Sequence, residues 1–286
     1  MIKSYKFRRV FANTFSYVLL AVLGLIWVSP LVSLVLHSFR DDGSLAYVDY
    51  LIPKAFSFQN YIDLFTPTSG GTNFPRWFLN TLIVAAFSCV ISTLAVLMVS
   101  YSFSRMRFKA RKPMINIGMI LGMFPGFMTM IAIYYLLKAM GLTQTLVALV
   151  ICYSAGAGLG YQISKGFFDT IPRALDEAAT IDGATKNQIF WKIILPMSKP
   201  IIVYPVLTSF IGPWTDFILA KIIMGSKIDN YTVAIGLQNM LAAGKALTQF
   251  KMFLAGSVVV AVPITTLFMI MQRYYVEGVT AGGVKG

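Results

Sequence analysis

Two carboxylates close to two alanines mark the part of this chain that is best suited to bind another molecule. They lie in the segment 165–199, which separates two long apolar stretches. Carboxylates accept charged hydrogen bonds, and small alanines allow a partner's surface to approach closely. The candidate docking residues are Glu177, Ala178, Ala179, Asp182 and Gly183. This pattern predicts non-covalent docking rather than catalysis.

The spacing around these residues predicts a short helix that is closed by a glycine. Pro172 suits the first helical position. Asp176 and Glu177 lie in the early turns, where the helix dipole favours acids. Gly183 then ends the helix.

A second, amphipathic helix is predicted from Thr185, because Gln188 follows three residues later as in a capping box. Its apolar face consists of Ile189, Phe190, Ile193 and Ile194. Such a helix pair either lies on lipid headgroups or protrudes to meet a partner. An anionic membrane surface would repel the two acids, which disfavours a position on the lipid headgroups.

The sequence offers little else for covalent chemistry or metal binding. His37 is the only histidine, and Cys89 and Cys152 both fall within apolar stretches. The phosphate-binding pattern Gly-x-x-x-x-Gly-Lys-Ser/Thr is absent, since Gly244-Lys245 is followed by alanine. We therefore expect no catalytic residue, no metal site and no cofactor bound by this chain.

Composition indicates the elements that must position these residues. Of the 286 residues, 57% are hydrophobic and only 12% are charged, which is too few charges to cover a water-facing surface. A soluble enzyme, a disordered chain and a secreted disulfide scaffold are thereby excluded. Six unbroken apolar stretches are each long enough to span a bilayer as a helix. They are 15–36, 77–103, 113–137, 139–164, 200–220 and 252–272.

The net charge of +13 is explained by topology. With the amino terminus inside, most lysines and arginines fall in cytoplasmic segments, as the positive-inside rule requires. The sequence thus predicts an all-α polytopic membrane protein with six transmembrane helices and both termini cytoplasmic. This distribution of charge gives no support to nucleic-acid binding.

Three regions are expected along the chain. Residues 1–76 form a cytoplasmic tail, the first span and an external segment that is rich in aromatic residues and therefore packed. Residues 77–272 form a core of five spans with a cytoplasmic loop at 165–199 and an external loop at 221–251. The uncharged run 231–244 is too short to cross a bilayer, so it is placed outside. The Gly-rich tail 273–286 is expected to be cytoplasmic and irregular.

The docking motif carries a family resemblance. The pattern Glu177-Ala178-Ala179-x-x-Asp182-Gly183-Ala184, followed by Leu195-Pro196, resembles the EAA loop of binding-protein-dependent ABC importer permeases. The stretches 78–84, 124–142, 212–217, 231–238 and 278–286 are similar to the carbohydrate branch, in particular to the maltose-type second permease subunit. The resemblance implies the MetI-like permease fold in a bacterial cytoplasmic (inner) membrane.

The resemblance also implies partners. The chain would pair with a second homologous permease, dock on a cytoplasmic ABC ATPase dimer through the EAA residues, and receive sugar from an external solute-binding protein. ATP and Mg would be bound by the ATPase subunits. Gln238 and Asn239 lie in the loop that would reach the binding protein. The sugar is expected to be an oligosaccharide, either neutral or acidic.

A sugar pathway requires aromatic faces and polar groups within the spans. The candidates are Tyr134, Tyr135, Tyr153, Trp214 and Asp216. For each aromatic residue, packing or an interfacial position is the alternative. Asp216 is the only charge inside a predicted span; it is either functional or simply solvated or paired with Lys221. An ion-coupled secondary transporter is the alternative function.

Overall fold

A computed structural model describes residues 2–42, 48, 50–67, 72–156, 160–242 and 246–283. Within these residues every regular element is a helix, and one isolated antiparallel bridge joins Arg40 and Phe56. The all-α prediction is confirmed. The chain divides into two compact units, 1–67 with 239–259 and 68–238 with 260–286.

The first unit contains α1 (Ile2–Ser38), α2 (Gln59–Phe65) and the beginning of α14 (Ala246–Gly283). The Asn60 side chain donates hydrogen bonds of 2.9 Å to the carbonyl oxygens of Ser38 and Arg40. The ring of Phe39 packs against Phe58 and Tyr61, with centroids 5.2 and 5.0 Å apart. The part of the external segment that the structure describes is therefore packed, as its aromatic content predicts.

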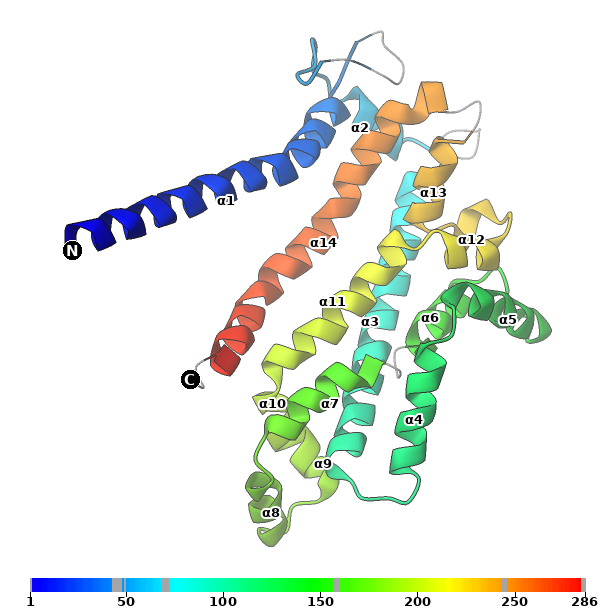
Figure 1. Cartoon of the computed structure of the whole chain (residues 1–286). Helices are drawn as coiled ribbons and strands as arrows, with labels where there is room; N and C mark the ends of the chain where they lie inside the picture. Colours follow the sequence, from blue (N-terminus) through cyan, green and yellow to red (C-terminus); the bar gives the residue numbers. More distant parts are fainter. Residues whose placement is uncertain are drawn as a thin grey trace. The chain divides into compact units, whose positions relative to one another are not determined.

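The second unit contains the helices that form the core (Figure 1). They are α3 (Phe74–Arg105), α4 (Arg111–Gly122), α5 (Gly126–Ala139), α6 (Leu146–Ala155), α7 (Tyr161–Thr170), α8 (Ala174–Ile181), α9 (Lys186–Ile189), α10 (Leu195–Met197), α11 (Lys199–Thr215), α12 (Ile218–Met224) and α13 (Val233–Met240). A π-helical turn, η2 (Phe190–Ile194), lies between α9 and α10, and a 3-10 turn, η3 (Ile228–Asn230), precedes α13.

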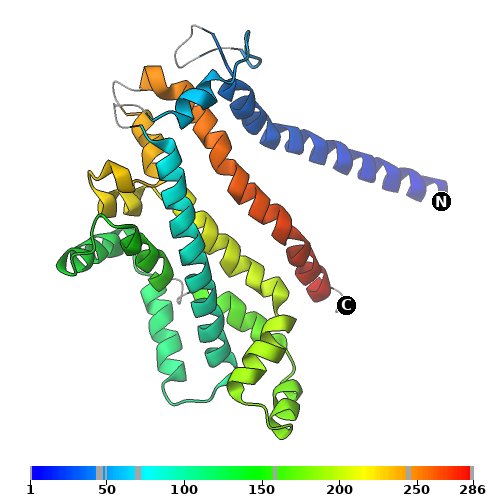
Figure 2. The ribbon, with the colours of Figure 1, turned by 180° about the vertical axis from the view of Figure 1, so that it is seen from behind.

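α3 is the central helix of this unit and packs against α6, α7 and α11 (Figure 2). A row of small serines makes the close approach possible. The Ser92 hydroxyl donates to the carbonyl oxygen of Tyr153 at 3.3 Å, and the Ser100 hydroxyl donates to that of Tyr161 at 2.9 Å. These bonds attach α3 to α6 and to the start of α7.

Three helices are long and apolar enough to cross a membrane, namely Arg9–Ser38, Phe74–Arg105 and Thr248–Tyr274. They contain the predicted spans 15–36, 77–103 and 252–272, which are confirmed as continuous helices. Two further pairs of helices pass the same test only if each bent pair is one span. The described residues thus give three to five candidate spans by length and composition.

The third predicted span, 113–137, is not one continuous helix. α4 and α5 meet at a bend of 102°. The amides of Met123 and Phe124 bond the carbonyl oxygens of Ile120 and Leu121, which tightens the end of α4. Pro125 follows; it lacks an N–H and disfavours helical backbone in the residue before it, so the helix cannot continue.

The fourth and fifth predicted spans are also interrupted. α6 begins at Leu146 rather than at residue 139, because Gly141 has a positive φ of 68° and Thr145 caps the helix by accepting from the amide of Ala148. Its ten residues end at Ala155, and the helical path resumes in α7. α11 ends at Thr215, before Asp216, and α12 begins at Ile218.

The carboxyl-terminal tail is not irregular over its described part. α14 continues as one helix to Gly283, although glycines favour an unordered chain. No proline follows Pro263 to interrupt the backbone hydrogen bonds, so the helix of the sixth span extends into the tail.

The first turns of α3 hold the loop that leads to α13. The Trp77 indole N–H donates to the carbonyl oxygen of Ile228 at 3.2 Å, and the Asn80 amide donates to those of Asp229 and Tyr231 at 2.9 and 3.0 Å. The backbone amide of Val233 then donates to the Thr81 hydroxyl at 2.8 Å. The predicted short element is the eight-residue α13, which is too short to cross a bilayer.

Gly236 of α13 lies directly against the indole ring of Trp77, where an alanine Cβ would overlap the ring. We expect Gly236→Ala to destabilise the protein by about 1–3 kcal/mol, because a packed core must shift to admit the methyl group. The thermal unfolding midpoint in detergent measures this effect. Gly212→Ala is the matched control, since no atom lies within 4 Å of its added Cβ. Equal midpoints for the two variants would contradict the packing argument.

Candidate functional site

The predicted docking motif forms α8 and a glycine turn. The Gly183 amide bonds the carbonyl oxygen of Thr180 at 3.1 Å, and the Ala184 amide bonds that of Ala179 at 2.9 Å. Gly183 has a φ of +84°, the left-handed conformation that this type of helix end requires. The prediction that Gly183 closes the helix is confirmed. Pro172 lies two residues before α8 rather than at its first position.

α8 presents one face to solvent and one to the protein. Ala174, Glu177, Ala178 and Ile181 recur at helical spacing and are exposed; Ile181 is 86% exposed. Ala179 is on the opposite face and is buried, with 7% exposure. The two alanines therefore differ in environment: Ala178 leaves an open surface, whereas Ala179 allows α8 to pack closely.

The second helix of the segment supplies the core beneath α8. Thr185 and Gln188 form the predicted capping box. Ile189, Phe190 and Ile194 are almost fully buried in one apolar cluster with Leu97, Tyr101, Phe168, Ile171 and Ala179. The predicted apolar face is confirmed, and it packs against α3 and α7. The π-helical turn at 190–194 adds a residue to this turn of the helix.

Arg105, at the last position of α3, joins three parts of the segment. One terminal guanidinium nitrogen, Nη2, donates to the carbonyl oxygens of Phe168 and Ile171 at 2.9 and 2.8 Å. The other, Nη1, lies 3.2 Å from Asp176 Oδ2, and the Arg105 side chain is only 4% exposed. A planar guanidinium has the donor geometry for this arrangement. α8 is thereby fixed to the end of a long apolar helix.

Three more hydrogen bonds reinforce this connection. The Ser104 hydroxyl donates to Asp169 Oδ1 and Lys165 donates to Asp169 Oδ2, each at 2.6 Å. Burial raises the pKa of Asp169, but the hydrogen bonds from Lys165 and Ser104 outweigh this cost and hold that pKa below its ordinary value. The Tyr101 hydroxyl donates to the carbonyl oxygen of Lys186 at 3.2 Å.

Sequence reasoning missed Arg105, Asp176 and Ile181 as parts of this site. Basic residues follow Arg105 in the sequence, and its spacing from Asp176 along the chain carries no signal. A small cavity of about 150 Å³ lies beside this ion pair. Arg107, Arg173, Glu177 and Lys186 are among its lining residues, so charged groups of both signs surround α8.

Among the predicted pathway residues, the structure brings Tyr153 and Asp216 together. The Tyr153 hydroxyl donates to Asp216 Oδ2 at 2.9 Å, and the Leu219 amide donates to Oδ1 at 3.1 Å. Lys221 instead donates to the Tyr231 hydroxyl at 2.6 Å. Asp216 therefore lies at the break between α11 and α12 and is bonded to α6, rather than paired with Lys221.

The other predicted pathway residues lie elsewhere. Trp214 is buried against Phe78, with ring centroids 5.1 Å apart, so packing accounts for most of its surface. Tyr134 and Tyr135 lie next to each other on α5, and Tyr135 is 64% exposed. Gln238 is exposed on α13 and Asn239 is half-buried.

A cavity of about 230 Å³ beside Tyr153 is lined mainly by hydroxyl-bearing residues and glycines. Its lining residues are Ser92, Val96, Tyr153, Gly156, Gly160, Tyr204, Pro205, Thr208 and Ser209. The cavity lies beside the end of α6 and the start of α7. Tyr204, Thr208 and Ser209 were not predicted.

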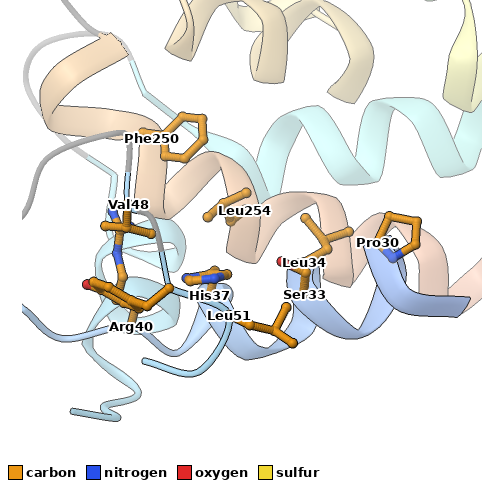
Figure 3. Close-up of a pocket in the computed structure, with 10 residues that line it drawn as sticks. Pro30, Ser33, Leu34, His37, Arg40, Val48, Leu51, Phe250 and Leu254 are labelled. Atoms are coloured by element: carbon orange, nitrogen blue, oxygen red, sulfur yellow. The ribbon is translucent and has the colours of Figure 1, made fainter. Parts of the chain in front are cut away.

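A larger cavity of about 560 Å³ lies within the first unit (Figure 3). Pro30, Leu34 and Leu254 form apolar walls, and the buried side chains of His37 and Arg40 lie at its polar end. His37, the only histidine of the chain, is one of the lining residues.

The chain matches a known family over most of its length. The family described as "Binding-protein-dependent transport system inner membrane component" matches residues 91–280. The chain belongs to this family of ABC importer permeases, and its relatives place it in the carbohydrate branch. It is a membrane transport subunit rather than an enzyme. This membership supports the ABC permease interpretation over an ion-coupled transporter.

Two relatives align with this chain over their full lengths. A galactooligosaccharides transport system permease protein, GanQ of Bacillus subtilis, is 35% identical, with 100% of both chains covered. A maltodextrin transport system permease protein, MalD of Streptococcus pneumoniae, is 33% identical with the same coverage. A chain of a bacterial ABC transporter that imports the acidic polysaccharide alginate has the same fold, with a TM-score of 0.79, 19% identity, and 93% of this chain and 97% of that chain covered.

The Arg105 contacts generate a prediction about local order. We expect Arg105→Gln to raise tryptic cleavage at the exposed Arg173 about tenfold, because α8 loses its ion pair and two carbonyl oxygens lose their donor. Cleavage is followed by mass spectrometry on the purified protein. Arg105→Lys, which keeps the charge but not the planar fork, should give an intermediate rate. Lys192→Gln removes an exposed cation of the same segment and is the control. Equal cleavage in all three variants would show that Arg105 does not fix α8.

Proposed function

We propose that this chain is the permease subunit of an ATP-driven importer of oligosaccharides, and that α8 transmits the motion of an ATPase to the membrane helices. The observation that carries the proposal is the exposed face of α8 together with the Arg105 link to α3. A partner that binds this face and moves it also moves the end of a long apolar helix.

Glu177, Ala178, Ala179, Asp182 and Gly183 are assigned the coupling role. Glu177 and Ala178 would face a cleft of the ATPase, with Ile181 as an apolar anchor that the motif alone does not indicate. Ala179 would keep α8 packed on its core, and Asp182 and Gly183 would set the turn. ATP and Mg would be held by two ATPase subunits, one of which docks here.

The remaining partners follow from the family. A second homologous permease would complete the pathway, and an external solute-binding protein would deliver the sugar near Gln238 and Asn239. Both termini would lie in the cytoplasm of a bacterial cell, with the chain in the inner membrane. Six crossings would require α4 with α5 to form one span, α6 with α7 another and α11 a third, beside the three long helices.

Transport would proceed by alternating access. ATP binding closes the ATPase dimer, α8 moves with it, and the two permeases open toward the binding protein. ATP hydrolysis releases the dimer and restores the inward opening. The coupling is reciprocal, so arrival of the sugar-loaded binding protein favours the ATP-bound state.

A neutral oligosaccharide fits the pathway residues better than an acidic one. Hydroxyl groups line the 230 Å³ cavity, and the Asp216 carboxylate is held at its neighbour Tyr153. A carboxylate accepts hydrogen bonds from sugar hydroxyls but repels a uronate. The two relatives, whose names give galactooligosaccharides and maltodextrin, support the same class.

We expect Glu177→Lys to release the ATPase, because charge reversal on the exposed face of α8 opposes docking. The measurement is co-purification of the ATPase with the tagged permease, with retention falling at least about tenfold, or 1.4 kcal/mol. Asp63→Lys, the same charge change on α2, is the control and should keep the ATPase. Full retention by the Glu177 variant would reject the docking role.

Tyr153→Phe tests the pathway separately. Loss of its hydroxyl leaves Asp216 Oδ2 without its donor, so we expect about a tenfold fall in uptake of malto- or galacto-oligosaccharides with the ATPase still retained. Tyr17→Phe, on the exposed surface of α1, should leave uptake unchanged. If uptake is normal in Tyr153→Phe, the Tyr153 hydroxyl is not part of the pathway.

A further inference from the structure

A cavity of about 420 Å³ lies between the end of α3 and the start of α4. Its lining residues are Arg107, Phe108, Lys109, Arg111, Lys112, Ile115 and Lys165. Five of the seven are cations and two are apolar, and no acidic residue is among them. Like charges around one cavity repel one another, and a bound anion would offset this repulsion.

Nearby acids neutralise only part of this charge. Lys165 forms an ion pair with Asp169 at 2.6 Å, on the side of the cavity that faces α7. Arg111 and Lys112 occupy the first turn of α4, and this turn contains no acid. Cations at this end of a helix oppose the helix dipole. Local electrostatics therefore disfavour these two residues unless they serve a ligand.

The position of the cavity indicates the kind of anion. α3 is a candidate membrane span that ends at Arg105, two residues before the first lining residue. α4 exposes Met114, Ile117 and Ile120, which are 50%, 55% and 61% exposed. The cations thus stand at the boundary between an apolar helix surface and water, where phosphate headgroups and acyl chains are both within reach.

We propose that this cavity binds the phosphate headgroup of an anionic phospholipid of the cytoplasmic leaflet, with its acyl chains along α4. The proposal rests on the topology in the proposed function, which places this loop in the cytoplasm. Basic pockets between membrane helices on this side are suited to acidic headgroups. Phe108 and Ile115 give the cavity an apolar lining, and exposed apolar residues follow on α4. The acyl chains of a lipid require such a surface, whereas a protein partner would not.

The cavity is directly connected to residues 165–199, the coupling segment of the proposed function. Lys165 lines the cavity and also binds Asp169, which accepts from Ser104 next to Arg105. A bound headgroup would hold Lys165 and α7 in position against the end of α3. Anionic lipid would therefore raise the efficiency with which movement of α8 reaches the membrane helices.

The test uses the assembled permease and ATPase complex in nanodiscs of phosphatidylcholine, with or without phosphatidylglycerol. The site variant is Lys109→Gln, Arg111→Gln and Lys112→Gln combined. The control variant, Lys54→Gln, Lys138→Gln and Lys227→Gln, removes the same charge from segments assigned to the outside. The readouts are the phosphatidylglycerol that stays bound after detergent extraction, by mass spectrometry, and the sugar-stimulated ATPase rate.

We expect the site variant to retain at least fivefold less phosphatidylglycerol than the control variant and to lose the stimulation of ATPase activity by this lipid. Lys109→Arg with Lys112→Arg should retain the lipid, which separates charge loss from misfolding. Equal retention in the site and control variants would overturn the proposal. Displacement of the lipid by inorganic phosphate alone would identify free phosphate as the ligand and also overturn it.

Two more outcomes separate this proposal from its alternatives. Loss of the ATPase from the site variant, with lipid retained, would assign the cations to a protein partner. Glu177→Lys should lose the ATPase but retain phosphatidylglycerol. If Glu177→Lys keeps the ATPase while the site variant still loses lipid, the proposed docking role fails and the lipid site stands.

Discussion

The guanidinium of Arg105 is the interaction on which the organisation of this permease depends. It is buried, and it connects the end of α3 with the end of α7 and with Asp176 on α8. A buried charge is costly unless it is paired and hydrogen-bonded, and here two carbonyl oxygens and a carboxylate are the partners of its two terminal nitrogens. Without it, α8 would be held to the core chiefly by the small side chain of Ala179.

α3 connects two distant segments of the chain, because each of its ends is hydrogen-bonded to one of them. At one end Arg105 and Ser104 hold the coupling segment, and at the other Trp77, Asn80 and Thr81 hold the backbone before α13. A rigid helix between two held loops transmits displacement with little loss, whereas separate contacts would relax independently. The proposed partners on the two sides of the membrane would therefore bind segments that are held at opposite ends of one helix.

The sequence predicted the features that local patterns determine. The capping box at Thr185, the glycine turn at Gly183 and the apolar face at 189–194 depend on residues within one or two turns, and all are present. Apolar length correctly located the helices that have no internal break. The sequence could indicate the proposed docking motif because its residues are contiguous.

What the sequence did not reveal depends on contacts between distant residues or on competing local effects. Arg105 and Asp176 are 71 positions apart, and nothing in either neighbourhood pairs them. Pro125 and Asp216 lie within apolar stretches, but hydropathy averages over a helix break and cannot register it. The prediction of an irregular tail was wrong for the opposite reason. The glycines of the tail lower its helix propensity, but no residue stops the helix.

The serine row of α3 has a consequence for how such subunits diversify. Ser92 and Ser100 bond main-chain carbonyl oxygens of α6 and α7, not their side chains. Every amino acid supplies the same main-chain carbonyl. Side chains on α6 and α7 can therefore change during evolution without loss of these two hydrogen bonds. Residues that line the proposed sugar pathway, such as Tyr153, can therefore change while α3 stays attached to α6 and α7.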